Sequence, residues 1–348
     1  MLEEMRYIKR LLPAMIALVL VVACGGSSPT TQLVIPEQGR AVETALGEVI
    51  VPQSPQRVVV LSQNALDNSL ALGIKPIAST YSGFPQRSNY GNFASYLADE
   101  SDGIVNIGHS SQPNFEAILE LKPDLILSNV EDHRTFYNTL SQIAPTVLVE
   151  TRADAITTYA TALGKPEQGQ ALIQDFQARV QDFRQQMGDR LETTEVSVLR
   201  FRPDQVRLYM RNSFCGYILE QVGLPRPPSQ AKAKFYETVS LEAIPAMDGD
   251  VIFYFQDNPQ NSMAQKVTRH PLWQQLGAVQ QEKVYPVSFD TWFLGNGILA
   301  ANALLDDLFK YLVDNPVWGM TTILDRTATS PETINTQGSG IAIRVTTN

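Results

Sequence analysis

The sequence is poor in the side chains that most often bind metal ions. Its 348 residues include only three histidines, His109, His133 and His270, and two cysteines, Cys24 and Cys215. Zinc and manganese sites usually draw on several such ligands at once, so a His-rich metal site is not expected. The cysteines form no CxxC pair, which excludes zinc ribbons and thioredoxin-like redox chemistry.

Positive charge is also scarce. The chain has 27 Lys+Arg against 36 Asp+Glu, a formal net charge of -9. Nucleic acid is therefore not expected as a partner, because binding it requires a basic face. Hydrophobic residues make up 44% of the chain, which is enough for an ordinary core and argues against global disorder. At ~150 residues per domain, this length suggests about two domains.

The start of the chain indicates export. Lys9 and Arg10 precede a short apolar run, residues 11–23, which ends at Cys24 and is followed by Gly and Ser. A basic segment before such a run is typical of a secretory signal, and the run is shorter than the ~20 residues of a membrane-spanning helix. The small residues before Cys24 resemble a bacterial lipobox, in which the cysteine is lipidated. The alternative is a plain signal peptide with an incidental cysteine. We predict a signal peptide over residues 1–23 and a lipidated tether over 24–45.

Beyond the tether, short apolar runs alternate with segments of helical spacing. This alternation is typical of α/β folds with mostly parallel sheets. Residues 167–187 contain no proline, and their apolar positions step by three and four, which predicts one long amphipathic helix. We predict an N-terminal α/β lobe over 46–150, a linking spine helix over 151–190, a C-terminal α/β lobe over 191–320 and a tail over 321–348. The expected strands are residues 57–62, 75–79, 124–128, 146–149, 196–201, 206–210, 250–255 and 283–287. The other expected helices are residues 64–72, 114–121, 135–143, 214–222, 270–276 and 297–313, with a short one after Ser240.

This order of parts resembles the periplasmic iron–siderophore substrate-binding proteins of ABC importers, of the class that also binds cobalamin. The resemblance covers about residues 55–315 and rests on the order and spacing of five segments: residues 57–61, 70–76, 114–118, 121–126 and 143–147. It implies two Rossmann-like lobes with a ligand cleft between them. It also implies a lipid-anchored monomer in the periplasm or on the outer face of the cell membrane, which captures a chelated metal and delivers it to a membrane permease.

Cobalamin and haem remain alternative ligands, and an exported α/β enzyme is a more remote alternative. No G-x-S-x-G elbow, H-E-x-x-H or P-loop occurs, so catalysis is not expected. A ferric siderophore already supplies the oxygen ligands of its metal. Its binding protein needs no cofactor and no direct metal ligand, but it does need donors for anionic oxygens and aromatic surface for the organic frame.

Arginines around two predicted strands are the best candidate donors. Arg200 and Arg202 end the first strand, and Arg207, Tyr209 and Arg211 are spaced two apart along the second. Because residues two apart in a strand share a face, the last three are predicted to point the same way. The alternative is a solvated basic edge. The resemblance favours Arg202, Tyr209 and Arg211 as ligand contacts.

The N-terminal lobe offers weaker candidates. Residues 62–64 follow the first strand and should border the cleft. Tyr81 and Arg87 lie in a long loop with further aromatics, which could instead pack back on the lobe. Some relatives place an arginine before the helix that leads to residues 143–147, and here the basic candidate is His133 or Arg134.

Three other residues complete the predicted site. Trp292 lies in a Gly-flanked loop with Phe293 and could stack on the ligand, or pack on the closing helix. Glu116 and Glu242 each fall in the first turn of a predicted helix, where the helix dipole alone favours acidic residues. The resemblance implies that one glutamate per lobe docks onto arginines of the permease.

Overall fold

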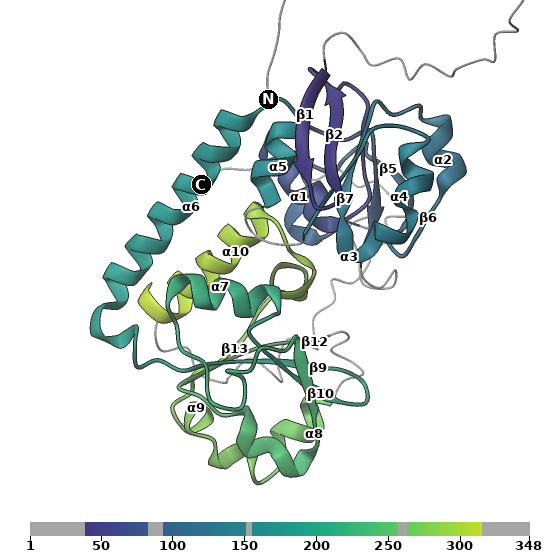
Figure 1. The fold of residues 1–348 in the computed structure, drawn as a ribbon. Helices are drawn as coiled ribbons and strands as arrows, with labels where there is room; N and C mark the ends of the chain where they lie inside the picture. Colours follow the sequence, from purple (N-terminus) through teal and green to yellow (C-terminus); the bar gives the residue numbers. More distant parts are fainter. Residues whose placement is uncertain (1–38, 83–92, 151–154, 257–262, 315–348) are drawn as a thin grey trace, which may run out of the picture. The chain divides into compact units, whose positions relative to one another are not determined.

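The computed structural model describes residues 39–82, 93–150, 155–256 and 263–314, all of which lie within the compact unit Gln38–Asn348. These residues form two larger sheets, one in each half of the chain, and one two-stranded hairpin (Figure 1). The predicted α/β class is confirmed. No helix in these ranges is both long enough and apolar enough to cross a membrane.

The first large sheet has six strands in the order β6-β5-β4-β3-β7-β8. All neighbours are parallel except β5 and β6. Their bounds are β3 Val58–Val60, β4 Ala78–Tyr81, β5 Val105–His109, β6 Gln112–Pro113, β7 Leu125–Asn129 and β8 Thr146–Val149. The central strands are short and largely buried, as their β-branched sequences predicted.

Helices cover both faces of this sheet. Val59 and Ile126 belong to one cluster with residues of α2 and α4, whereas Val60 and Leu127 belong to a larger cluster with residues of α1 and α5. The helices of this half are α1 Gln63–Ala71, α2 Phe115–Glu120, α3 Val130–His133, α4 Tyr137–Ser141 and α5 Ala155–Ala162, with short 3-10 turns η1 Ser95–Leu97 and η2 Arg134–Phe136. The single helix predicted over 135–143 is therefore interrupted, and the strand predicted over 75–79 begins three residues later.

The predicted tether extends too far. Strands β1 Gly39–Thr44 and β2 Gly47–Pro52 form an antiparallel hairpin within and just beyond the range 24–45. The hairpin is part of the folded unit, because β1 packs on α5 and β8, and Arg40 Nη1 donates to the carbonyl of Thr161 at 2.8 Å. Alternation of small and polar residues over six positions gave too weak a strand signal in the sequence.

The second large sheet has five strands in the order β11-β10-β9-β12-β13. Only the β9–β12 and β12–β13 pairs are parallel; β10 is antiparallel to both of its neighbours, so this sheet is more mixed than predicted. The bounds are β9 Val196–Phe201, β10 Val206–Tyr209, β11 Tyr236–Val239, β12 Val251–Gln256 and β13 Val284–Pro286. β9 and β10 form a hairpin closed by Arg202 N donating to the carbonyl of Gln205 at 2.9 Å.

Each face of the second sheet has its own core. Leu199, Leu208 and Ile252 pack with Trp273, while Val198 and Phe253 join the large cluster that includes α7 and α10. The remaining elements of this half are α7 Phe214–Val222, α8 Ala264–Thr268, α9 Gly277–Gln280 and α10 Ile298–Leu308, with η3 Gly188–Arg190, η4 Leu241–Met247, η5 Trp273–Gln275, η6 Asp290–Leu294 and η7 Phe309–Asp314. The helix predicted over 270–276 is only the short turn η5.

The long helix predicted between the halves is α6, Pro166–Met187. Proline in its first turn needs no intrahelical N–H partner, and Gly188 follows its last residue. α6 packs on α5 from the first half and on α7, α10 and η7 from the second. Gly169 allows the contact with α5, because a Cβ at this position would lie 2.4 Å from the Cβ of Ala160.

We expect the methyl group added in Gly169→Ala to cost about 1–3 kcal/mol, because it overpacks the α5–α6 contact. The gain of about 1 kcal/mol that alanine normally brings to a helix offsets part of this cost, so the net loss of stability should be up to about 2 kcal/mol. Urea unfolding followed by circular dichroism measures the change. Gln170→Ala, at the exposed neighbouring position, is the control and should be nearly neutral. A variant Gly169→Ala that is as stable as the control, or more stable, would show that overpacking costs no more than the gain in helix propensity.

Candidate ligand-binding site

Two arginines face each other across the antiparallel pair β9 and β10. The register pairs Arg207 with Arg200, Arg200 with Phe255 on β12, and Arg207 with Thr238 on β11. These four residues therefore form one row across the sheet, on a single face. The row lies near the carboxyl ends of β9 and β12, the edge where ligands bind in open α/β sheets.

Arg200 is surrounded by aromatic side chains. Its guanidinium carbon lies 4.3 Å from the ring centre of Phe293 and 4.8 Å from that of Phe289, and its Nη1 donates to Tyr209 Oη at 3.0 Å. Only 1% of Arg200 is exposed. Burial raises the pKa of Tyr209, an effect that the positive charge of Arg200 opposes, so the hydroxyl stays protonated at neutral pH.

Arg207 lies closer to solvent. Its guanidinium carbon is 4.0 Å from the ring centre of Tyr236, and its Nε is buried with no hydrogen-bond partner among the described residues. Tyr236 and the adjacent Phe235 are 38% and 47% exposed, which is unusual for large aromatics. We call this set the aromatic–arginine platform: Arg200, Arg207, Tyr209, Phe235, Tyr236, Phe289 and Phe293.

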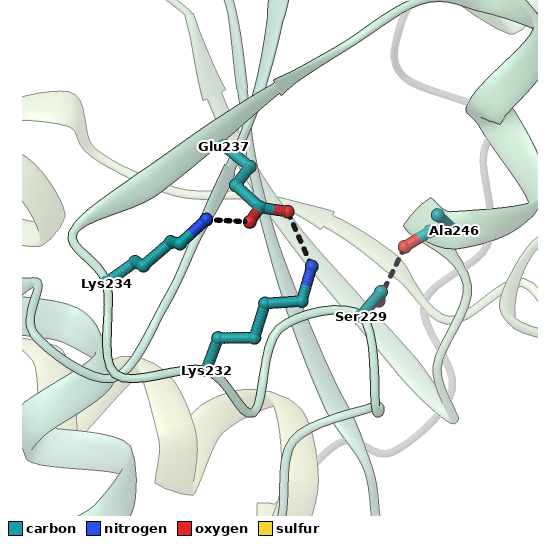
Figure 2. Close-up of polar contacts among 5 residues, drawn as sticks. All are labelled: Ser229, Lys232, Lys234, Glu237 and Ala246. Carbon is teal, nitrogen blue, oxygen red and sulfur yellow. Dashed lines mark hydrogen bonds and ion pairs between the residues drawn. The ribbon is translucent and has the colours of Figure 1, made fainter.

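Nearby lysines do not add to this platform. Lys232 and Lys234 each donate to a different carboxylate oxygen of Glu237 at 2.7 Å, as Figure 2 shows. These hydrogen bonds lower the pKa of Glu237. Glu237 pairs with Leu208, one position from the row that holds Arg207, so its side chain points to the opposite face of the sheet. Beside them, Ser229 Oγ donates to the carbonyl of Ala246 at 2.8 Å (Figure 2).

Two other predicted arginines are placed differently. Arg202 is half-buried in the hairpin turn just beyond β9, near the platform. Arg211 does not share a strand face with Arg207 and Tyr209, because β10 ends at Tyr209. It is exposed and forms an ion pair with Glu220 of α7 at 3.3 Å. The prediction that these three residues point the same way is wrong for Arg211.

Trp292 is not available for stacking on a ligand. Its side chain is fully buried, its ring centre lies 4.8 Å from that of Phe253, and its Nε1 donates to Asp307 of α10 at 2.7 Å. The structure therefore corresponds to the alternative, in which this residue packs on the closing helix. Its neighbour Phe293, which is half-buried, contacts Arg200 instead.

The candidate residues from the first half of the chain lie far apart in the sequence, and those that the structure describes have different neighbours. Tyr81 is half-buried and packs edge-on against His109, with ring centres 5.1 Å apart. Arg134 is exposed on η2. Arg87 and the lipidation candidate Cys24 lie outside the described residues.

His133 is a structural residue. It is fully buried, its Nδ1 is 2.8 Å from Ser128 Oγ, and its Nε2 is 2.8 Å from the carbonyl oxygen of Ser110. Since a carbonyl only accepts, Nε2 carries a proton; in the neutral ring, which burial favours, Nδ1 then accepts from the serine hydroxyl. Burial lowers the pKa of His133. His133 therefore does not supply the basic contact that Arg134 or His133 was expected to make.

Residues 62–64 do not border an open surface either. All three are buried at the start of α1. Ser62 Oγ caps this helix by accepting from Ala65 N at 3.2 Å, and Asn64 Nδ2 donates to the carbonyl of Asn296 in the second half.

The two predicted docking glutamates are both exposed and both lie in a first turn. Glu116 is in α2, which Asn114 caps by accepting from Ala117 N at 3.1 Å. Glu242 is in η4, and a hydrogen bond with Ser240 lowers its pKa. Ser240 makes no side-chain bond to the backbone of η4, so the predicted cap is absent there.

Two hollows are found elsewhere on the described part of the chain. One of about 490 Å³ is lined by residues such as Glu195 and Asp250, at the amino ends of β9 and β12, and one of about 470 Å³ lies along α6 and α7. None of the candidate residues lines either hollow. Within the described ranges, no group of three or more His, Cys, Asp or Glu side chains is placed to hold a metal ion.

Sequence reasoning missed Phe235, Tyr236 and Phe289. The run of aromatic and β-branched residues over 235–239 was a usable signal for β11. The position of Tyr236 beside Arg207 depends on the antiparallel pairing of β10 with β11, which the sequence does not reveal.

The family model for periplasmic binding proteins matches residues 58–291. The chain belongs to this family. The probable siderophore-binding lipoprotein YfiY of Bacillus subtilis is 37% identical, over 88% of this chain and 98% of its own length. The achromobactin-binding periplasmic protein of Dickeya dadantii is 34% identical, over 76% and 90%. Staphylococcus aureus SirA, solved with staphyloferrin B, superposes with a TM-score of 0.70 at 28% identity, over 78% of this chain and 98% of its own. The resemblance and the two-lobed class inferred from the sequence are confirmed, and both the family and these relatives are binding proteins.

The buried ring of His133 predicts a pH dependence of stability. Its pKa in the folded protein is below the ordinary value of 6.5, so the unfolded chain binds the proton more readily. The stability that His133 contributes is therefore present above pH 6.5 and is lost as the pH falls through the lowered pKa. We expect His133→Gln to lose less unfolding free energy than the wild type between pH 7.5 and pH 5. Chemical denaturation at both pH values measures this, with His270→Gln as the control. Parallel losses in the wild type and His133→Gln would contradict the assignment.

Proposed function

We propose that this chain captures an anionic ferric siderophore and delivers it to the permease of an ABC importer for iron uptake. The observation that carries the proposal is the pairing of Arg200 with Arg207 on one sheet face, against exposed and half-buried aromatic rings. Guanidinium groups donate to carboxylate and hydroxyl oxygens of a chelate in a fixed fork geometry, and the rings offer surface to its organic frame. The chelate itself supplies the ligands of the iron.

The names of the relatives favour the same class of cargo. One relative is described as binding siderophores, one as binding achromobactin, and SirA was solved with staphyloferrin B. Cobalamin and haem are less well matched, because they need aromatic or apolar walls, and haem an axial ligand, more than two opposed arginines. A neutral cargo would offer no anionic acceptor to Arg207, whose Nε is buried without a hydrogen-bond partner among the described residues.

The rest of the site extends this proposal. Arg202 would contact the chelate beside the arginine pair, and Tyr209, which is fully buried, would act by holding Arg200 through its hydroxyl. Tyr81, Arg87 and Arg134 would meet the chelate from the first half of the chain, across a cleft. Arg211 and Trp292 are left out, because one is engaged with Glu220 and the other is buried. The protein would work as a monomer, tethered through lipidated Cys24 in the periplasm or on the outer face of the cell membrane.

The test of ligand capture is Arg207→Ala. One charge-assisted hydrogen bond in a desolvated site contributes ~1.5–3 kcal/mol, so affinity should fall about tenfold or more. Isothermal titration with ferric achromobactin, ferric staphyloferrin B and ferric citrate measures it. Arg211→Ala and Arg269→Ala, both at exposed positions, are matched controls and should bind within about twofold of the wild type. If Arg207→Ala binds as well as these controls, or the wild type prefers haem or cobalamin, the proposal fails.

Delivery to the permease is tested by reversing the charge of both docking candidates. Two exposed carboxylates, Glu116 and Glu242, could orient the protein on a basic permease surface. Glu116→Lys combined with Glu242→Lys should leave chelate affinity unchanged and abolish uptake of radiolabelled ferric chelate by cells. Glu120→Lys combined with Glu192→Lys changes the net charge equally at other exposed positions and should retain uptake. Normal transport by the first double variant, or loss of its ligand affinity, would refute the docking role.

A further inference from the structure

Helix α10 begins without a capping side chain of its own. Its N-cap residue is Gly297, and the first backbone N–H groups of any helix have no partner inside the helix. Serine or aspartate would normally serve here. A Cβ at Gly297 would lie 2.2 Å from Asp67 Oδ1, so no side chain fits.

The missing cap comes from α1, about 230 residues earlier in the chain. Asp67 Oδ1 accepts from Leu299 N at 2.9 Å, and Asp67 Oδ2 accepts from Ala300 N at 3.0 Å. Asn68 Oδ1 accepts from Ile298 N at 3.2 Å. The first three N–H groups of α10 are thus bound by side chains of the other half of the chain.

Asp67 is held in place itself. It is fully buried, and Tyr96 of η1 donates its hydroxyl proton to Asp67 Oδ2 at 2.9 Å. Burial raises the pKa of Asp67 to about 6, while the bonds from Leu299 and Ala300 oppose the shift. At pH 7.5 the carboxylate is therefore ionised, the form that a helix N-terminus favours.

The start of α10 is only a short connection away from the ligand platform. Residues 295–297 join it to η6, whose residue Phe293 and preceding residue Phe289 lie against Arg200. A second bond holds the other end of η6, where Ser95 N donates to Asp290 Oδ2 at 2.9 Å. Residues of the first half thus fix both ends of the segment that carries these two rings.

We propose that Asp67 is a positioning residue for ligand binding: by capping α10 from α1, it fixes the segment that holds Phe289 and Phe293 against Arg200. The inference rests on the proposed function for the identity of the ligand. Asp67 touches no ligand in this scheme and acts only through the two rings.

The test is Asp67→Asn in the full chain at pH 7.5, which keeps the shape of the side chain but replaces one acceptor with a donor. Asp99→Asn, at an exposed position, is the matched control. Hydrogen exchange read by mass spectrometry should show faster exchange both at 298–300 and at 289–294, by about tenfold. Affinity for whichever of the three ferric chelates the wild type binds should fall about tenfold, and Asp99→Asn should match the wild type in both readouts.

Tyr96→Phe is the milder variant, because it removes one hydrogen bond to Asp67 and leaves the carboxylate in place. It should change both readouts in the same direction by a smaller factor, and it decides the matter if Asp67→Asn does not fold. Faster exchange confined to 298–300 with unchanged affinity would overturn the proposal and leave Asp67 a purely structural cap. If the wild type binds none of the chelates, the proposed function fails, and exchange at 289–294 still decides whether Asp67 positions the rings.

Discussion

The first backbone N–H groups of α10, which need partners from outside the helix, are the constraint on which much of this fold depends. A buried helix end needs partners for these groups, and here α1 supplies them from the other half of the chain. This explains why α1 carries Asp67 and Asn68 at buried positions. It also explains why one large core cluster contains residues of both sheets, with α10 packed against α1, α6 and α7.

Arg200 and Arg207 place two positive charges opposite each other on neighbouring strands. Like charges directly opposite each other on neighbouring strands destabilise a sheet. Aromatic faces offset part of that cost, since Phe289 and Phe293 flank Arg200 and Tyr236 lies against Arg207. An anion bound at the guanidinium of Arg207, the more exposed of the two arginines, would offset part of that repulsion.

The spacing of apolar residues was sufficient to predict those helices and strands that depend on burial alone. The strand at residues 58–60, helix α7 and the long helix α6 follow directly from runs of apolar residues with the right spacing. The same spacing did not predict the position of side chains that depend on a tertiary contact. Trp292 and Phe293 are neighbours of similar character, and only the packing of α10 determines that the tryptophan is buried. Arg211 lies two residues beyond the end of β10, and that is enough to turn it toward Glu220. The polar residues of α1 gave no sign of their partners, because those lie more than two hundred residues away.

The cations around the second sheet differ in kind between its two faces. Lys232 and Lys234 are paired with Glu237 on the opposite face of β11 from Arg207. Each ammonium group thereby has a carboxylate oxygen as its partner, whereas the cations on the face of Arg207 are planar guanidiniums. A planar fork recognises carboxylate geometry as well as charge, and rings beside it exclude water from the contact. That combination suits an organic chelate with fixed anionic oxygens better than a hydrated metal ion, whose shell presents water rather than carboxylates.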